Sequence, residues 1–322
     1  MTMITDITIV GGGPVGLFAA YCAGMRGLSV SLFETLPYVG GQLATLYPDK
    51  YIYDIAGIPK IKALDLIKQL QEQCSSFPIN FYLNDQVLDL CNQTDHLQLK
   101  TTSGFYLTKA LIIAAGCGAF KPKTLALEEA PAYDYKGLFY TVKNKNDFKD
   151  KNVLIAGGGD SALDWLLTLE PLAKTTTLIH RRDCFRAQAH LVNQAKATSA
   201  NILTPYHITR LKGSPLNNVI IKNLKDEATM DLAVDKVLVN YGFKSLLGPL
   251  KNWSLELDGP RIKVNASFET NLPRVYAIGD VAVYPGKLRL ITIGFGEAPI
   301  AIGNIAKRLG YKQTPLHSTA LG

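Results

Sequence analysis

Two stretches of the chain repeat the same pattern of hydrophobic and polar positions. Residues 7–27 and 153–169 each contain a short apolar run, a turn of three glycines and a second, longer apolar segment. The short runs have the length of strands and the longer segments the spacing of helices, so each stretch predicts a strand, a glycine turn and a helix. Two such units in 322 residues predict an α/β protein with two Rossmann-like nucleotide-binding domains.

Further strand-like runs follow each repeat and suggest how the chain passes between the domains. The first series ends in the apolar run 110–116 and the second in the run 236–242, and each run finishes on a glycine that we expect to act as a hinge. The simplest arrangement places the second domain inside the first. We therefore predict one domain from residues 1–117 and 243–322, and an inserted domain from residues 118–242.

Another apolar run near the end of the chain predicts a strand and a helix. Residues 275–280 form the strand, which ends in Gly279-Asp280, and the helix is expected from about Pro299 to Leu309. Asp280 stands at the end of the strand, and its neighbour Gly279 has no side chain that would block a ligand. The Asp280 carboxylate therefore suits a hydroxyl of a ribityl chain. The positive end of the helix suits the electron-rich edge of a reduced flavin.

The first glycine turn has the G-x-G-x-x-G spacing of a dinucleotide-binding loop. Gly11 allows the tight turn, Gly13 lets the backbone approach a pyrophosphate, and Gly16 lets the helix pack on the strand. Pro14 opens the helix, whose amino end faces the anion. Glu34 ends the next strand, where its carboxylate can accept hydrogen bonds from the hydroxyls of an adenosine ribose. These residues predict a site for a dinucleotide without a 2′-phosphate.

The second glycine turn differs in its last position, where alanine replaces glycine. Gly157 and Gly159 hold the first two positions, and Asp160 and Ser161 begin the following helix. We assign all four to a second dinucleotide, while a helix cap is the simpler interpretation of Asp160.

Basic residues stand where the first site has its carboxylate. Glu34 follows Gly11 by 23 residues, and the position 23 residues after Gly157 holds His180, with Arg181 and Arg182 directly behind it. A carboxylate would repel a 2′-phosphate, whereas guanidinium groups bind one in a bidentate manner. The second site is therefore predicted to bind NADP, with His180, Arg181, Arg182 and Arg186 as contacts.

Composition limits the classes of function. Apolar residues make up 47% of the chain and charged residues 19%, which excludes a disordered chain, and no apolar run is long enough to cross a membrane. The N-terminus lacks a signal sequence, so a cytoplasmic protein is expected. The net charge of +7 favours an acidic partner. No nucleic-acid-binding module is visible, and the five cysteines, expected to be reduced core thiols, have no metal-ligand spacing.

With these motifs in view, the whole chain resembles the low-molecular-weight, thioredoxin reductase-like flavoproteins, and most closely the bacterial ferredoxin–NADP reductases of that type. The resemblance rests on both glycine turns and on further short motifs along the chain, which are residues 40–43, 47–54, 180–182, 279–280, 294–299 and 317–319. It implies that FAD occupies the first domain and NADPH the inserted one.

One departure separates the chain from true thioredoxin reductases, which carry a redox-active Cys-x-x-Cys before the second glycine turn. The corresponding residues 140–146 contain no cysteine. Without a dithiol, the flavin cannot pass two electrons to a disulfide by thiol exchange.

The resemblance also assigns roles around the flavin. It implies that Tyr47 stacks on one face of the flavin ring, and that His317 and Ser318 cover the other face from the partner subunit of a homodimer. These three residues are the candidate catalytic groups. Further FAD contacts are implied at four positions, which are Gln42, Val87, Phe120 and Thr319.

The activity that the resemblance implies is hydride transfer between NADPH and FAD, followed by transfer of single electrons to ferredoxin or flavodoxin. Such carriers are generally acidic, in keeping with the positive net charge. The alternatives are a disulfide or peroxide reductase that works with a separate dithiol protein, and a redox sensor without turnover. A flavin monooxygenase is disfavoured because the chain has no further fingerprint between the two motifs.

Overall fold

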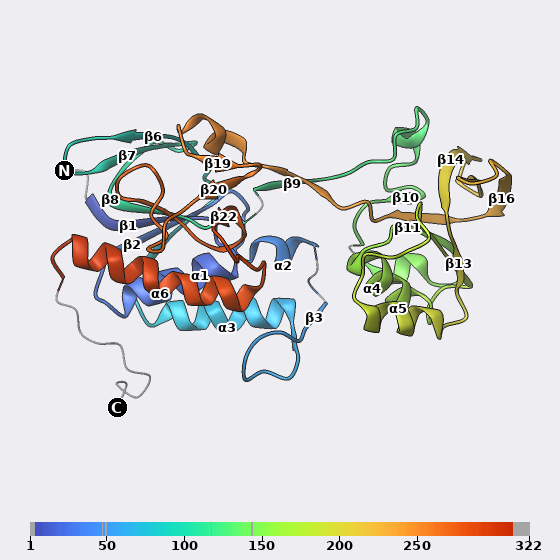
Figure 1. Ribbon diagram of the computed structural model, residues 1–322, viewed down its shortest axis with the longest axis horizontal. Coiled ribbons are helices and arrows are strands. Elements are labelled where there is room, and N and C mark those ends of the chain that lie inside the picture. The colour runs from blue at the N-terminus through green and yellow to red at the C-terminus, as the bar shows by residue number, and fades with distance from the viewer. Residues whose placement is uncertain (1–3, 47, 49, 117, 143, 312–322) are drawn as a thin grey trace. The chain divides into compact units, whose positions relative to one another are not determined.

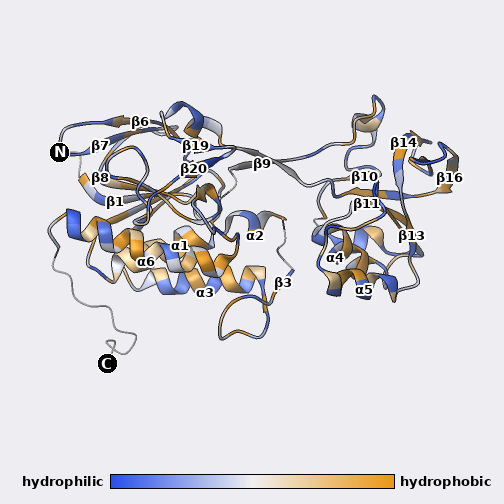
Figure 2. Cartoon of the chain, in the orientation of Figure 1, coloured by the Kyte–Doolittle hydropathy of each residue, from blue (hydrophilic) through white to orange (hydrophobic). Residues whose placement is uncertain are grey.

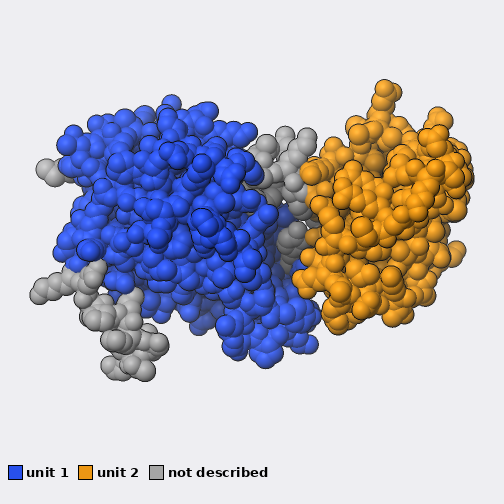
Figure 3. Space-filling view, viewed as in Figure 1, with its two compact units in different colours: residues 1–119, 245–322 blue, residues 120–244 orange. Residues whose placement is uncertain are grey.

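The computed structural model describes residues 4–46, 48, 50–116, 118–142 and 144–311. The chain divides into two compact units (Figure 3). Unit 1 comprises residues 1–119 and 245–322, and unit 2 comprises residues 120–244. The two connections between the units pair with each other as short strands, β9 (Ala119–Pro122) and β18 (Phe243–Leu246).

The centre of unit 1 is a seven-stranded sheet in the order β5-β2-β1-β8-β7-β6, with β21 also paired to β8. Strands β5, β2, β1, β8 and β21 run parallel, while β6, β7 and β8 form an antiparallel meander. The strands are β1 (Ile4–Val10), β2 (Val30–Glu34), β5 (Ile79–Leu83), β6 (Val87–Asn92), β7 (Leu97–Thr101), β8 (Phe105–Ile113) and β21 (Val275–Ala277).

Three helices of unit 1 lie together on one side of this sheet (Figure 1). They are α1 (Pro14–Gly24), α3 (Ala63–Ser75) and α6 (Ile291–Arg308). Helix α1 is apolar on all sides because it packs between the sheet, α3 and α6, and the apolar colouring of this helix is visible in Figure 2. Strand β2 is buried along its whole length, as expected for a parallel strand covered on both faces.

Shorter elements complete unit 1. The helix α2 (Gly41–Leu46) follows β2, and a small antiparallel ladder joins β3 (Tyr51–Ile52) to β4 (Ile61–Lys62). A second core on the other face of the sheet contains Phe33, Val87 and Trp253. The remaining elements are η3 (Gly248–Asn252), β19 (Leu257–Asp258), β20 (Arg261–Lys263), η4 (Gly279–Val281) and β22 (Ala282–Val283).

Unit 2 contains a parallel five-stranded sheet in the order β10-β17-β11-β12-β13 and an antiparallel sheet in the order β14-β15-β16. Its elements are η1 (Ala130–Tyr133), β10 (Leu138–Phe139), η2 (Lys145–Phe148), β11 (Asn152–Ala156), α4 (Asp160–Leu169), β12 (Thr175–Ile179), α5 (Ala189–Lys196), β13 (Asn201–Leu203), β14 (Tyr206–Lys212), β15 (Asn218–Asn223), β16 (Thr229–Ala233) and β17 (Lys236–Val239). Both predicted strand, turn and helix units are confirmed, as β1-α1 and β11-α4.

One predicted element has the wrong boundary. The last helix begins at Ile291, eight residues before the expected start at Pro299, and it includes Gly294 and Pro299. Glycine and proline discourage helix interiors, but α6 packs against α1 and this tertiary contact outweighs the local preference. The amino end of the helix is therefore at Leu290, which also corrects the expected position of its positive end.

Candidate functional site

The first glycine turn leaves an open space in front of α1. Gly11 has φ of +110°, and a Cβ built on it would lie 2.5 Å from the carbonyl oxygen of Ala114. A Cβ on Gly16 would lie 1.9 Å from the oxygen of Gly11. Nothing lies within 4 Å of a Cβ on Gly13, and no side chain caps the amino end of α1. The turn is closed on the protein side and open on the other, which fits an approaching pyrophosphate.

Glu34 is connected to this turn through the backbone. Its Oε2 accepts a hydrogen bond from the amide of Gly12 at 2.8 Å, and its Oε1 accepts one from the amide of Leu36 at 3.0 Å. The side chain is buried, so these two bonds fix its orientation at the end of β2. Each carboxylate oxygen keeps a further lone pair for a ribose hydroxyl.

Other predicted FAD contacts lie around the same turn. A Cβ on Gly41 would lie 3.2 Å from Cα of Gly13, and a Cβ on Gly116 would lie 3.5 Å from Nε2 of Gln42. Helix α2 therefore begins against the turn, and Gln42 reaches the end of β8. These positions belong to the carboxyl ends of β1 and β8, the edge where parallel sheets bind ligands.

Gly279-Asp280 is brought to the same edge from far along the chain. A Cβ on Gly279 would lie 3.4 Å from Val15 Cγ1, and one on Gly294 would lie 2.4 Å from Val15 Cγ2. The first turn of α1 thus touches both the turn after β21 and helix α6. Pro14 is the first residue of α1, next to Val15.

The remaining FAD assignments differ in what the structure describes. Val87 is 4% exposed and its side chain packs in the second core of unit 1, so only its backbone is available to a ligand. Phe120 belongs to β9, and its side chain is not among the described groups. Tyr47, together with the tail residues His317, Ser318 and Thr319, lies outside the described residues.

The second glycine turn repeats the geometry of the first in unit 2. A Cβ on Gly157 would lie 2.6 Å from the carbonyl oxygen of Asn240, and one on Gly158 would lie 2.4 Å from the ring of His180. Nothing lies within 4 Å of a Cβ on Gly159, and α4 has no side-chain cap. The open side again fits a pyrophosphate.

The basic residues after β12 divide into one buried and three exposed side chains. His180 is 8% exposed, and its ring stacks on Phe185 with centroids 5.5 Å apart. Burial lowers the pKa of His180, and the charges of Arg181, Arg182 and Arg186 lower it further. The imidazole is therefore neutral at pH 7, and its ring packs against Gly158 of the glycine turn.

The three arginines are exposed and have no ion-pair partner within the part of the chain that the structure describes. The amide of Arg186 donates to the carbonyl oxygen of Gly158 at 2.8 Å, which holds this segment against the glycine turn. Three guanidinium groups in one segment beside the turn, with no ion pair to a described carboxylate, suit a phosphate group.

Asp160 and Ser161 occupy the first turn of α4. Asp160 Oδ1 accepts a hydrogen bond from the amide of Gln188 at 2.8 Å, so this carboxylate ties the arginine segment to the helix and does not cap it. Ser161 follows at the second helical position and is partly buried.

Asn240 is a site residue that the sequence reasoning missed. It follows β17, its amide donates to the oxygen of Ala156 at 2.7 Å, and its side-chain Nδ2 is buried without a hydrogen-bond partner. Its carbonyl oxygen faces Gly157. The available signal in the sequence was a polar residue directly after the apolar strand β17, because ligands bind at the carboxyl ends of parallel strands.

The cysteines in the described part of the chain divide into two buried and two exposed side chains. Cys22 and Cys74 are buried, and burial raises the pKa of Cys22 to about 12 and that of Cys74 to about 11, so both are inert core thiols. Cys91 and Cys184 are exposed, so the expectation that they are core residues is wrong: both stand in polar sequence, which the interpretation overlooked. Cys117 lies outside the described residues.

The described residues show neither a metal site nor a membrane-spanning helix. They contain no group of three or more histidine, cysteine, aspartate or glutamate side chains arranged to hold a metal ion. None of the helices in that part of the chain is both long and apolar enough to span a bilayer.

Comparison with known families decides the assignment. Residues 5–301 match the family described as pyridine nucleotide-disulphide oxidoreductase. The chain belongs to this family. The ferredoxin–NADP reductase of Halalkalibacterium halodurans is 49% identical over 98% of this chain and 97% of its own length. Ferredoxin–NADP reductase 2 of Shouchella clausii is 48% identical with the same coverage.

Solved structures agree on the fold of this family member. The thioredoxin reductase of Lactococcus lactis has a TM-score of 0.82 and 24% identity, covering 94% of this chain and 98% of the other. The predicted α/β fold and the resemblance to thioredoxin reductase-like ferredoxin–NADP reductases are confirmed.

Proposed function

We propose that this oxidoreductase is an FAD-dependent ferredoxin–NADP reductase. The observation that carries the proposal is the pair of open glycine turns with opposite charge at the end of the following strand. Glu34 is hydrogen-bonded to the first turn, and the segment of Arg181, Arg182 and Arg186, which form no ion pair with the described residues, is hydrogen-bonded to the second. The two curated relatives at 48–49% identity carry this activity in their names.

FAD binds unit 1 in this proposal, with its pyrophosphate at the amino end of α1. Gly11, Gly13 and Gly16 form the backbone cradle, and Glu34 accepts hydrogen bonds from the adenosine ribose. Asp280 holds the ribityl chain, since its turn lies against Val15 at the same edge of the sheet. FAD-binding residues therefore come from residues 1–117 and 243–322.

NADPH binds unit 2, with its pyrophosphate at the amino end of α4. Gly157 and Gly159 form the cradle, while Arg181, Arg182 and Arg186 neutralise the 2′-phosphate. His180 and Asp160 hold these arginines in place through packing and through the bond to Gln188. The inserted domain of residues 118–242 is thus the NADPH domain.

When bound, the flavin exchanges the two-electron hydride of NADPH for the single electrons that an iron–sulfur protein accepts. The residues of this chain bind and orient the two nucleotides. Residues 140–146 supply no dithiol, so electrons leave the protein directly to a separate carrier. The carrier is ferredoxin or flavodoxin.

The protein also supplies groups around the flavin ring in this proposal. Tyr47 stacks on one face, and His317, Ser318 and Thr319 cover the other from the second subunit of a homodimer, while Gln42 lies at the polar edge. The family resemblance supports these roles, and the position of Gln42 against Gly116 agrees with them. We further propose that the protein works in the cytoplasm.

The test is anaerobic electron transfer by the purified protein from NADPH, and separately from NADH, with and without ferredoxin. Reduction of cytochrome c that needs both NADPH and ferredoxin or flavodoxin is the expected result. A different result would contradict the proposal: NADPH reduces the bound flavin, but neither ferredoxin nor flavodoxin accelerates the reduction of cytochrome c. That result would favour a disulfide-type reductase or a sensor.

A further inference from the structure

An ion pair with almost no access to solvent lies next to the turn Gly279-Asp280. The side chains of Lys287 and Glu297 are 5% and 3% exposed, and Lys287 Nζ donates to Glu297 Oε1. Removing two charges from water is costly, and replacing such a pair by apolar residues is often neutral or stabilising. Fold stability is therefore a poor explanation for this pair.

The Glu297 carboxylate makes two more contacts. Its Oε2 accepts a hydrogen bond from the amide of Gly279 at 2.6 Å, and its Oε1 accepts one from the hydroxyl of Tyr284 at 2.7 Å. Lys287 Nζ also lies 5.4 Å from the centre of the Tyr284 ring. We call these four residues, Gly279, Tyr284, Lys287 and Glu297, the Glu297 clamp.

The Glu297 clamp connects helix α6 to the end of strand β21. Gly279 has φ of +74°, a left-handed conformation, and it begins the short η4 turn that contains Asp280. The amide before it, that of Ile278, donates to Ile113 at the end of β8. Glu297 thus holds the backbone at the point where the chain leaves the sheet and passes the first turn of α1.

We propose that Glu297 is a positioning residue for FAD. By holding the amide of Gly279, it fixes the turn that presents Asp280 to the ribityl chain, and Lys287 and Tyr284 compensate and orient its carboxylate. This inference rests on the proposed binding of FAD to unit 1. Sequence reasoning noticed Glu297 only as part of a short motif and gave it no role.

The experiment separates positioning from simple stabilisation by removing both charges at once. In the full-length protein, Lys287→Met with Glu297→Leu fills the same space without an ion pair or an acceptor for Gly279. A matched control, Arg308→Met with Glu269→Leu, removes the pair at the other end of α6, where the side chains are 42% and 24% exposed. FAD is removed from each variant, and its dissociation constant is measured from flavin fluorescence on rebinding.

We expect the apoprotein of the clamp variant to unfold cooperatively in urea, at a midpoint below that of the wild type because the Gly279 amide and the Tyr284 hydroxyl lose their acceptor, while its dissociation constant for FAD rises about tenfold or more. The control should keep its FAD affinity within about twofold. An unchanged FAD affinity in the clamp variant, or an equal loss in the control, would overturn the inference. If the clamp variant does not fold, Glu297→Gln, which keeps the shape of the side chain, replaces it under the same criteria.

A second measurement asks whether Glu297 acts through Asp280. Asp280→Asn is measured alone and combined with the clamp substitutions, because residues that act as one unit give non-additive effects. We expect Asp280→Asn to weaken FAD binding about tenfold in the wild-type background and less than about threefold in the clamp variant. Additive losses would show that the two sites are independent and would contradict the positioning role. Ferredoxin reduction by the wild-type protein tests the proposed function separately.

Discussion

At the scale of the residue, Gly13 and Gly16 show two different reasons for lacking a side chain. Gly16 has no room for one, because Gly11 lies against it. Gly13 has room in the protein itself and an extended backbone, with φ of −70°, that alanine adopts readily. If the space in front of Gly13 belongs to a pyrophosphate, the two positions should respond differently to alanine.

The substitution Gly13→Ala is expected to leave the stability of the apoprotein unchanged and to weaken FAD binding by about tenfold or more, since the new methyl group occupies the space of the phosphate. Urea unfolding and flavin fluorescence measure the two quantities. Gly16→Ala is the matched comparison, and we expect it to lower the free energy of unfolding by about 3 kcal/mol through overpacking. Equal FAD affinity in Gly13→Ala and wild type would place the pyrophosphate elsewhere.

The arginines after β12 are expected to determine coenzyme preference. Replacing Arg181 and Arg182 by glutamine removes charge-assisted bonds, so KM for NADPH should rise about 10- to 100-fold, while KM for NADH changes less than about twofold. Steady-state reduction of ferricyanide with each coenzyme measures this. Lys174→Gln, on the same unit, serves as a control. A parallel change for both coenzymes would argue against 2′-phosphate binding.

The sequence predicted the glycine turns, Glu34 and the arginines because each depends on spacing along a continuous segment. It missed Asn240 and the role of Glu297, since their partners Gly157 and Gly279 are 83 and 18 residues away in sequence, as the residue numbers show. Contacts of this kind depend on how strands and helices meet, which periodicity does not encode. The exposure of Cys91 and Cys184 was missed because cysteine is buried in most proteins.

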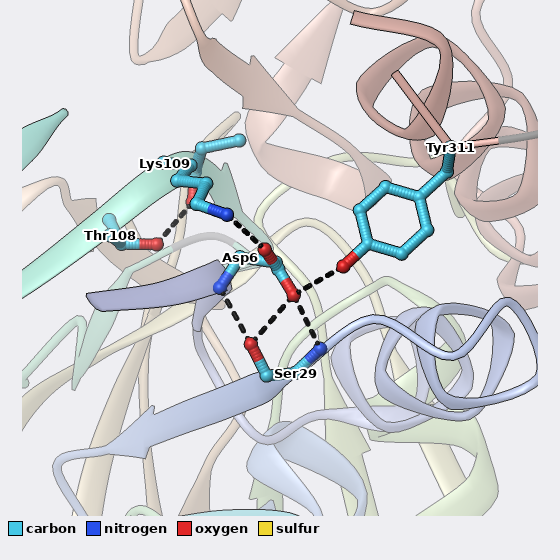
Figure 4. Close-up of polar contacts among 6 residues, drawn as sticks. Asp6, Ser29, Thr108, Lys109 and Tyr311 are labelled. Atoms are coloured by element: carbon cyan, nitrogen blue, oxygen red, sulfur yellow. Dashed lines mark hydrogen bonds and ion pairs between the residues drawn. The ribbon is translucent and has the colours of Figure 1, made fainter. Parts of the chain in front are cut away.

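At the scale of the element, Asp6 of β1 joins segments of unit 1 that lie far apart in the sequence (Figure 4). Its Oδ1 accepts from Lys109 Nζ of β8 at 2.8 Å. Its Oδ2 accepts from the amide and hydroxyl of Ser29, just before β2, and from the hydroxyl of Tyr311, after α6. One buried carboxylate therefore fixes β1, β2, β8 and the chain that leaves α6.

These contacts make folding depend on pH. Burial acts to raise the pKa of Asp6, but the bonds from Lys109, Ser29 and Tyr311 outweigh it and lower the pKa to about 2, from an ordinary value of 3.8. Because the pKa of Asp6 is lower in the folded than in the unfolded state, its ionised carboxylate stabilises the fold by about 2 kcal/mol above pH 4. This contribution is lost as the pH falls from about 4 to about 2.

The corresponding prediction concerns Asp6→Asn. Its free energy of unfolding should be about 2 kcal/mol below that of the wild type at pH 7, and the gap should narrow between about pH 4 and pH 2. Urea unfolding across this range measures the gap. Lys109→Met should give part of the same loss, because it removes one of the bonds. A gap that does not change with pH would mean that the ionised carboxylate contributes nothing.

The start of α6 shows where element boundaries escape prediction. A sequence with Gly294, Gly296 and Pro299 predicts a helix that begins late, because each residue disfavours a helix interior. In the fold, Gly294 is needed inside the helix, since any side chain there would meet Val15 of α1. The close approach of two helices, and not local preference, decided this boundary.

At the scale of the whole molecule, the net charge of +7 bears on the carrier. The rate of ferredoxin reduction is expected to fall about tenfold or more between 0.05 and 0.5 M salt, because salt screens attraction between oppositely charged surfaces. Reduction of the small acceptor ferricyanide by NADPH, measured alongside, corrects for effects on coenzyme binding. A rate of ferredoxin reduction that falls no more than that of ferricyanide would show that charge does not guide docking.

The discontinuity of unit 1 has a consequence for synthesis on the ribosome. Strand β8 ends at Ile113, yet its partner β21 begins at Val275, after all of unit 2 has been made. Until β21 and α6 emerge, the apolar edge of β8 and one flank of α1 have no cover. Unit 2, whose residues 120–244 are continuous, can complete its own sheets earlier. The nascent chain can therefore complete unit 2 first, while Leu111 and Ile113 of β8 still lack their partner strand β21.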